Sequence, residues 1–274
     1  MIRLMQPEDL PAIKTLWRQA FGEGDDVESA IQDFAGMTHA WVDERDGKVA
    51  AMLLTPPAQI GTHKGVYLCA LATAKEWQNK GVATAMLNHV LDLLAQVGVE
   101  FAALIPENET LVPFYQARGF QQAFARRRLE KPLTRNLWSR AEFDTVPVRS
   151  MSELRAKFCP QTVQFSAEAT GWCVADLYKR GVTVVSNPGG YGMYFRKGDC
   201  LHFAELMAKN DDAVTCLLQA VREREVVAER AVFTVPADSS LFLGEGSRYY
   251  HGMIRFLAQP FDLEGSYLGL AMDV

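Results

Sequence analysis

Residues 76–86 read EWQNKGVATAM, a polar turn with a single glycine that leads directly into an apolar helix containing alanine. The preceding stretch, GVYLCALAT at 65–73, is apolar at nearly every position and predicts a strand buried on both faces. A turn between a strand and a helix leaves backbone N–H groups without partners, and the helix dipole adds positive charge there. We therefore predict a phosphate-binding turn. Gly81 has no side chain, so the backbone can approach the ligand closely, and the small side chain of Ala83 leaves the next point of approach open.

The composition and the remaining motifs argue against several other classes of protein. The chain has 274 residues, 49% of them hydrophobic, and a formal net charge of -5, which predicts a globular protein of two domains without a nucleic-acid partner. The cysteines contain no CxxC pair, the histidines no HExxH and the serines no GxSxG, so we expect no metal and no serine-hydrolase site. Without a long apolar run or a signal peptide, we expect a cytoplasmic protein with no membrane partner.

The first half of the chain predicts a mixed α/β domain, which we assign to residues 1–132. The segment PPAQIGTHKG at 56–65 is predicted to be a loop. The expected elements are a strand at 2–5, a helix from Leu10 to Phe21, a hairpin that turns at Asp46 and Gly47, the strand at 65–73, a helix from Val82 to Val97, a strand at 100–106, a short helix at 113–118 and a strand at 119–130.

The second half, assigned to residues 137–274, follows a polar connection, KPLTRNLWSR, at 131–140. Its expected elements are strands at 182–186, 191–197 and 200–208, a helix from about Asp211 with Asn210 as its N-cap, and strands at 230–236 and 251–257. This order of hairpin, strand, helix, strand and strand repeats that of the first half. We therefore predict a duplicated α/β topology whose two sequences have diverged.

The turn and a second motif resemble the GNAT (GCN5-related) N-acetyltransferases. The acetyl-CoA loop of that family has Gln or Arg, two residues, Gly, one residue, and then Gly or Ala, and its second element is an Asn followed after seven residues by Tyr and then by Gly-Phe. The matching residues are Gln78, Gly81, Ala83, Asn108, Tyr115, Gly119 and Phe120. The resemblance covers roughly residues 1–130. The loop differs from many members in having Gln78 and Asn79 where Arg is common.

The resemblance implies a fold of two tandem GNAT-like domains, each a mixed sheet flanked by helices, similar to the enhanced-intracellular-survival and mycothiol-synthase proteins. It also implies transfer of an acetyl group from acetyl-CoA to a primary amine of a small molecule or peptide, by direct attack in a ternary complex. The pyrophosphate of CoA would lie on the loop amides, and the pantetheine arm would pair with the preceding strand. The residues expected to bind acetyl-CoA are Leu71, Ala72, Thr73, Gln78, Asn79, Lys80, Gly81, Val82, Ala83, Thr84 and Asn108.

The chemistry of this reaction needs a proton donor for the departing thiolate and a base for the amine. Tyr115 is the candidate acid, because a phenol can donate a proton to sulfur; the alternative is a packed aromatic ring beside Phe114. Asn108 could likewise only cap a short helix. Candidates for the base are Glu76 and an acidic group that could also be a solvated surface patch. That group consists of Glu23, Asp25, Asp26 and Glu28.

The second half lacks the features of the phosphate-binding turn. FAELMAKNDDAVTC at 203–216 has no glycine, and Asp211 and Asp212 at the helix start would repel a pyrophosphate, so this degenerate domain is expected to support the first or to shape the amine site. Two other functions stay open, a non-catalytic acyl-CoA-binding sensor or scaffold and a purely structural double domain. The sequence also allows for a homodimer.

Overall fold

The computed structural model describes residues 1–24, 26–134 and 140–270, and it contains two compact units. The first unit is formed by Met1–Gln122 and Gly252–Phe261, and the second by Ala123–His251 and the segment that starts at Asp262. The units differ from the expected domain bounds because one long strand after residue 122 pairs within the second unit, and residues 253–256 pair within the first. The domain bounds 1–132 and 137–274 stay a prediction, and residues 135–139 of the expected connection lie outside the described ranges.

The first unit contains two groups of strands, one a four-stranded sheet with the order β1-β2-β3-β6 and the other with the order β4-β5-β7-β15. Asp46 and Gly47, with φ angles of 50° and 72°, form the predicted hairpin turn between β2 and β3. The strands are β1 (Ile2–Leu4), β2 (Ala40–Arg45), β3 (Lys48–Leu54), β4 (Pro57–Ile60), β5 (His63–Tyr67), β6 (Cys69–Thr73), β7 (Phe101–Leu104) and β15 (Ser247–Phe256). The helices are α1 (Leu10–Phe21), α2 (Val27–Ser29), α3 (Val82–Gln96) and α4 (Val112–Gln116).

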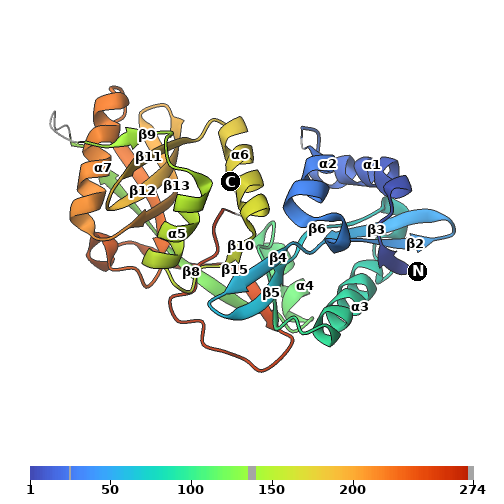
Figure 1. Ribbon diagram of the computed structural model, residues 1–274. Helices are drawn as coiled ribbons and strands as arrows, with labels where there is room; N and C mark the ends of the chain where they lie inside the picture. The colour runs from blue at the N-terminus through green and yellow to red at the C-terminus, as the bar shows by residue number, and fades with distance from the viewer. Residues whose placement is uncertain (25, 135–139, 271–274) are drawn as a thin grey trace. The chain divides into compact units, whose positions relative to one another are not determined.

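Helices cover both faces of the four-stranded sheet. α1 and α3 each pack against β3 and β6, and Figure 1 shows them on opposite sides of these strands. The α3 face that packs inward carries Met86, Leu87, Val90 and Leu91, all fully buried. Gly98, with a φ of 85°, follows the end of α3 as its sequence position predicts. The apolar stripe of α3 thus fixes the turn at its N-terminus against the sheet.

Two expectations for the first unit are wrong. The predicted loop at 56–65 contains the hairpin β4–β5, because Ala58, Ile60 and Val66 bury their side chains despite the surrounding prolines and glycines. The single buried strand expected at 65–73 is divided into β5 and β6 at Leu68, and most residues of β6 are only half-buried.

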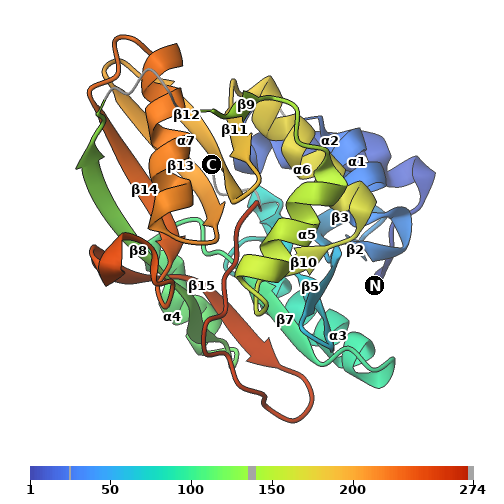
Figure 2. The ribbon, with the colours of Figure 1, turned by 60° about the vertical axis from the view of Figure 1, so that its left-hand side comes forward.

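The second unit has strands in the order β8-β14-β13-β12-β11-β9. Its strands are β8 (Gln121–Pro132), β9 (Glu142–Phe143), β10 (Gln164–Phe165), β11 (Thr183–Asn187), β12 (Gly190–Lys197), β13 (Cys200–Ala208) and β14 (Arg230–Pro236). Its helices are α5 (Val148–Phe158), α6 (Ala167–Lys179) and α7 (Asp211–Arg224). α7 packs against β11, β12 and β13, while α5 packs against β13 and α6. Figure 2 shows α7 on one face of this sheet and α5 with α6 on the other.

The two units repeat one arrangement of strands around a helix. In the first unit, β5 and β7 are parallel and α3 lies between them in the chain; in the second, β13 and β14 are parallel around α7. Two helices precede the central hairpin of each unit, although the sequence analysis identified only α1 and not α5 or α6. The predicted duplication is therefore present, with the second copy degenerate at the turn before its helix. No helix in the described ranges is long and apolar enough to cross a membrane.

Candidate active site

The candidate site begins at β6, the last strand of the four-stranded sheet. On one edge, Ala72 and Thr73 pair with β3, and no other described strand pairs with the outer edge. The chain arrives from β5, whose pairing with β7 ends where the Leu68 N–H donates to the Ala103 carbonyl at 2.7 Å. Ala70 then takes a φ of 52°, and the chain enters the other sheet. The edge at residues 71–73 can therefore accept an extended ligand as an additional strand.

The loop after β6 presents a row of backbone donors. From Asn79 to Thr84, no N–H group has a hydrogen-bond acceptor among the described residues, and the first bond into α3 runs from the Ala85 N–H to the Gly81 carbonyl at 2.9 Å. Asn79 and Gly81 take φ angles of 60° and 76°, which turn the chain tightly before α3. Consecutive donors at the N-terminus of a helix are suited to an anion such as a phosphate group.

The space beside this loop is open on the side of Gly81. Apart from its chain neighbours, a Cβ atom at Gly81 would have no heavy atom of the protein within 4 Å. Val82, by contrast, is buried, and it attaches the start of α3 to the core beneath. The loop is thus anchored from below and accessible at its glycine, which fits a diphosphate that approaches the backbone closely.

Side chains around the loop connect it to β6 and bring cationic groups to its start. The Gln78 side-chain N–H donates to the Thr73 carbonyl at 3.0 Å, which joins the loop to the end of β6. The Lys80 ammonium and the Arg45 guanidinium lie over the ring of Trp77, at 5.1 and 5.5 Å from its centre. Arg45 also pairs with Asp43 at 2.9 Å, so Lys80 is the cation of the two without an ion pair among the described residues beside the row of amides.

Tyr115 lies on α4 with its ring packed between two other aromatic rings. The ring centres of Phe114 and Phe120 are 5.1 and 5.7 Å from that of Tyr115. Burial, together with the nearby Glu107 carboxylate, raises the pKa of Tyr115 to about 12, against the opposing effect of Arg118. The hydroxyl is protonated in the physiological range, as that of an ordinary tyrosine is, and the raised pKa extends this to more alkaline pH.

Arg118 is a residue of this site that the sequence analysis missed. Its Nε donates to the Thr84 hydroxyl at 3.0 Å, a second guanidinium nitrogen contacts the same hydroxyl, and a third bonds to the Phe114 carbonyl. The guanidinium also lies 3.5 Å from the ring centre of Phe114. Arg118 thereby holds the first turn of α3 against α4, which carries Tyr115. In the sequence, Arg118 directly precedes the motif residues Gly119 and Phe120, and this position could have identified it.

The other predicted residues are placed as follows. The Asn108 side-chain oxygen accepts from the Thr110 N–H at 3.1 Å, so Asn108 caps the short helix at Glu109–Leu111, as one of the two interpretations expected. Among the candidate bases, Glu76 is exposed in the short helix Lys75–Trp77. Three others have partners: Glu23 pairs with Arg18, Asp26 caps the Ser29 N–H and Glu28 pairs with Lys14. Asp25 lies outside the described residues.

The corresponding turn of the second unit has two of its donors engaged and carries acidic side chains. Asn210 caps α7 by accepting from the Ala213 N–H at 3.0 Å, and the Asp211 carboxylate accepts from the Phe242 N–H at 2.7 Å. The Lys209 N–H donates to the Gly189 carbonyl at 2.8 Å. The Asn210 side chain and the Gly189 carbonyl therefore take two donors of this turn, and the carboxylates of Asp211 and Asp212 place negative charge at the helix start, where it would repel an anion.

Comparison with known families matches the segment that carries these features to the GNAT acetyltransferases. Residues 10–120 match the model of the acetyltransferase (GNAT) family. This segment of the chain therefore belongs to the GNAT superfamily, whose members are acetyltransferases and generally use an acyl-CoA as donor. No curated protein sequence matches the chain at a significant level.

Solved structures share the fold over both halves of the chain. A GCN5-related N-acetyltransferase from Anabaena variabilis is 18% identical with a TM-score of 0.71, and the match covers 94% of this chain and 72% of that one. One from Kribbella flavida is 14% identical with a TM-score of 0.74, covering 93% and 70%. Eis1 from Mycobacterium abscessus is 13% identical with a TM-score of 0.70, covering 94% and 74%. The chain thus has the fold of two tandem GNAT-like domains.

Proposed function

We propose that the chain is an N-acetyltransferase that moves an acetyl group from acetyl-CoA to a primary amine of a small molecule or peptide, by direct attack in a ternary complex. The observation that carries this proposal is the row of N–H groups from Asn79 to Thr84 without acceptors among the described residues, at the end of a strand with an unpaired edge. Membership of the GNAT superfamily supports it further.

The residues present fit acetyl-CoA, which supplies the acetyl group as a thioester. The amides of Asn79 to Thr84 bind the diphosphate, with Lys80 adding positive charge, and the edge of β6 at Leu71–Thr73 pairs with the pantetheine arm. A backbone N–H near Leu71 donates to the carbonyl oxygen that gains negative charge during transfer. Asn108 contacts acetyl-CoA from the start of the short helix that it caps.

Two proton movements accompany the transfer. A lysine-like amine with a pKa near 10.4 is almost entirely protonated at pH 7, which costs about 4.6 kcal/mol unless a base or an ordered water path removes the proton. The Tyr115 hydroxyl gives its proton to the departing sulfur. Glu76, exposed beside the loop, is the candidate base that has no ion pair among the described residues.

Replacing Tyr115 with Phe tests the catalytic role. The substitution keeps the ring between Phe114 and Phe120 and removes the hydroxyl alone, so kcat should fall on the order of 100-fold while the Kd of acetyl-CoA stays within about twofold. Thiol release from acetyl-CoA with a panel of amines measures kcat, and calorimetry measures Kd. Tyr250→Phe, at an exposed tyrosine, is the matched control. An unchanged kcat would remove Tyr115 from the mechanism.

The second candidate function is a non-catalytic acyl-CoA-binding sensor or scaffold. It is favoured by the ion pairs and cap that engage Glu23, Asp26 and Glu28, which leaves few carboxylates to serve as a base. The same assay separates the two functions. Saturable acetyl-CoA binding without turnover of any amine would support the sensor and contradict the transferase.

A further inference from the structure

A groove of the second unit gathers positive charge on a chain whose net charge is -5. It has a volume of about 400 Å³ and is formed over β8, β12, β13 and β14 with the end of α6. No acidic side chain is among the described residues that line it. Its cationic residues, with His202 beside them, are Arg128, Arg180, Arg196 and Lys197, and we call this site the basic groove.

Arg128 reaches the basic groove because its two neighbours are used elsewhere. The run Arg126–Arg128 lies on β8, and both Arg126 and Arg127 are buried. Arg126 donates to the Leu268 carbonyl, whereas Arg127 donates to backbone carbonyls of the segment after β14. Arg128 is exposed and forms no ion pair among the described residues. Two arginines of the run therefore stabilise the fold, and the third remains available to a ligand.

The other cations differ in their partners. Arg180 pairs with Asp176 at 2.8 Å and Arg196 with Glu225 at 3.4 Å, but neither acid lines the groove. Lys197, like Arg128, has no ion pair in the described part of the chain. The positive charge of the groove is thus only partly compensated, and a bound anion would be favoured.

His202 lies beside these cations, and its pKa responds to them. Burial lowers its pKa first, and the neighbouring Lys197, Arg128 and Arg230 lower it further, against the weaker opposite effect of Glu130. A neutral imidazole and the Thr234 hydroxyl add hydrogen-bonding groups to the wall. Phe195, half-buried, adds an aromatic surface. The groove thus offers cations, polar groups and a flat apolar contact together, in the size range of small-molecule sites.

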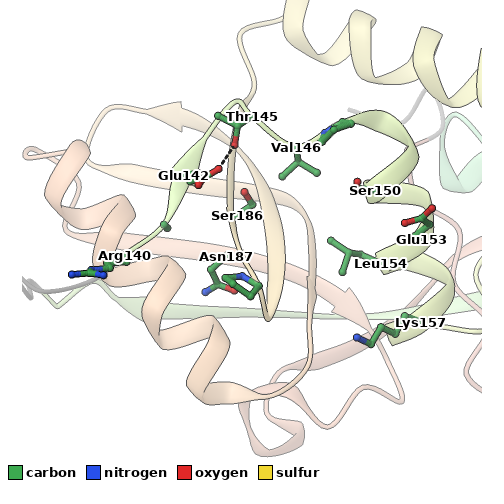
Figure 3. Close-up of a pocket in the computed structure, with 13 residues that line it drawn as sticks. Arg140, Glu142, Thr145, Val146, Ser150, Glu153, Leu154, Lys157, Ser186 and Asn187 are labelled. Carbon is green, nitrogen blue, oxygen red and sulfur yellow. Dashed lines mark hydrogen bonds between the residues drawn. The ribbon is translucent and has the colours of Figure 1, made fainter.

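A second cavity of the same unit lacks this character. Figure 3 shows it between α5, which contributes Leu154 and Lys157, and β11, which contributes Ser186 and Asn187; its volume is about 800 Å³. Its lining combines the cations Arg140 and Lys157 with the carboxylates Glu142 and Glu153. Because charges of both signs line this cavity, we expect it to show no preference for an anion. A cation of this larger cavity therefore serves as the control in the binding test below.

We propose that the basic groove is a binding site for a small organic anion, whose phosphate or carboxylate group lies between Arg128 and Lys197 and whose flat part contacts Phe195. Arginine and lysine bind such groups through charge-assisted hydrogen bonds. This site is separate in its residues from the loop at Asn79–Thr84 and does not depend on the proposed acetyl transfer.

The test uses the full chain with Gly81→Glu, so that the loop of the first unit does not contribute. Inorganic phosphate, citrate and phenyl phosphate are titrated by calorimetry, and phosphate against citrate distinguishes the two anionic groups. We expect saturable binding that weakens with salt, and roughly tenfold weaker binding for each of Arg128→Gln and Lys197→Gln. Lys157→Gln, in the cavity of Figure 3, should change affinity by less than about twofold.

Two further readouts make the proposal specific. Phenyl phosphate should bind more tightly than inorganic phosphate, and Phe195→Leu should remove the difference. The bound anion should raise the pKa of His202, followed by its NMR signals, because a nearby negative charge favours the imidazolium. Absence of saturable binding by all three probes, or affinities unaffected by Arg128→Gln and Lys197→Gln, would overturn the site.

Discussion

Tyr115 is fixed in place by its neighbours and keeps its proton to an unusually high pH. Its ring is fixed between Phe114 and Phe120, and its pKa of about 12 keeps the hydroxyl protonated. The position was predictable, because Tyr115 is the seventh residue after Asn108 in the motif. The raised pKa was not predictable, because it depends on burial and on Glu107 nearby in the fold. The sequence shows which residue could act, whereas its surroundings set its pKa.

The pKa of Tyr115 leads to a prediction for the pH dependence of turnover. Because burial raises the folded pKa to about 12, the acid form persists well above pH 10, the region in which an ordinary tyrosine ionises. We expect kcat at saturating amine to show no alkaline decline from Tyr115 up to about pH 10.5. Initial rates from neutral pH upward measure this. A decline centred near pH 10 that Tyr115→Phe abolishes would contradict the raised pKa.

Gly81 controls access to the loop amides. Its φ of 76° is strained for other residues, and the space around a Cβ is open, so Gly81→Glu should fold while its carboxylate repels the diphosphate. We expect acetyl-CoA affinity to fall by about 100-fold or more, measured by calorimetry. Gly98→Glu, with a φ of 85° and open space at the other end of α3, introduces the same strain and charge. Equal affinity of the two variants would argue against the loop as the CoA site.

Among the elements, helix α3 and its turn were predictable, and helices α5 and α6 were not. The apolar spacing from Val82 to Leu94 is regular and bounded by two glycines, so the helix and its ends follow from the sequence. In α5 the residues that bury their side chains are Met151 and Arg155, and a buried arginine gives no apolar periodicity. Helix α6 contains a glycine, Gly171, within its span.

The buried arginine of α5 has a partner from a distant strand. Arg155 pairs with Glu205 of β13, and both side chains are almost fully buried. Tyr191 of β12 also bonds to Glu205, and a further nitrogen of Arg155 donates to the Thr162 hydroxyl at 3.0 Å. Such a network becomes visible only when the fold brings residues 155 and 205 together, which explains why the sequence analysis missed both the helix and the contact.

Removal of this arginine should weaken the second unit strongly. Arg155→Met leaves Glu205 buried without its charge partner, so we expect a loss of about 3–5 kcal/mol in the free energy of unfolding. Adding Glu205→Leu should recover a large part of the loss, since no charge then stays buried. Denaturant unfolding followed by circular dichroism measures both variants. Arg149→Met, at an exposed arginine of the same helix, should change stability by less than about 0.5 kcal/mol; a similarly small effect of Arg155→Met would refute the buried pair as a stabilising contact.

At the scale of the whole molecule, the duplication was predictable because the order of elements survives where the residues have diverged. Each unit contains a parallel strand pair connected through a helix. The hairpin β4–β5 was missed since its prolines and glycines outweigh a short alternation of buried residues, among them Ile60. The division between β5 and β6 was also missed, because an apolar run does not indicate which of two sheets it joins.

The two copies of the helix turn predict how many CoA molecules one chain binds. In the first unit the donors from Asn79 to Thr84 lack acceptors among the described residues, whereas at the equivalent turn of the second the Asn210 side chain accepts from the Ala213 N–H and the Lys209 N–H donates to the Gly189 carbonyl. A diphosphate there would also face the negative charge of Asp212. Calorimetric titration with acetyl-CoA should therefore give one site per chain, and Gly81→Glu should abolish it. Asp212→Asn should leave the stoichiometry at one, because the Asn210 side chain still takes the Ala213 N–H and the Asp211 carboxylate still repels an anion. Two sites per chain, or one that persists in the Gly81→Glu variant, would mean that the second unit binds the donor and that its turn opens to do so.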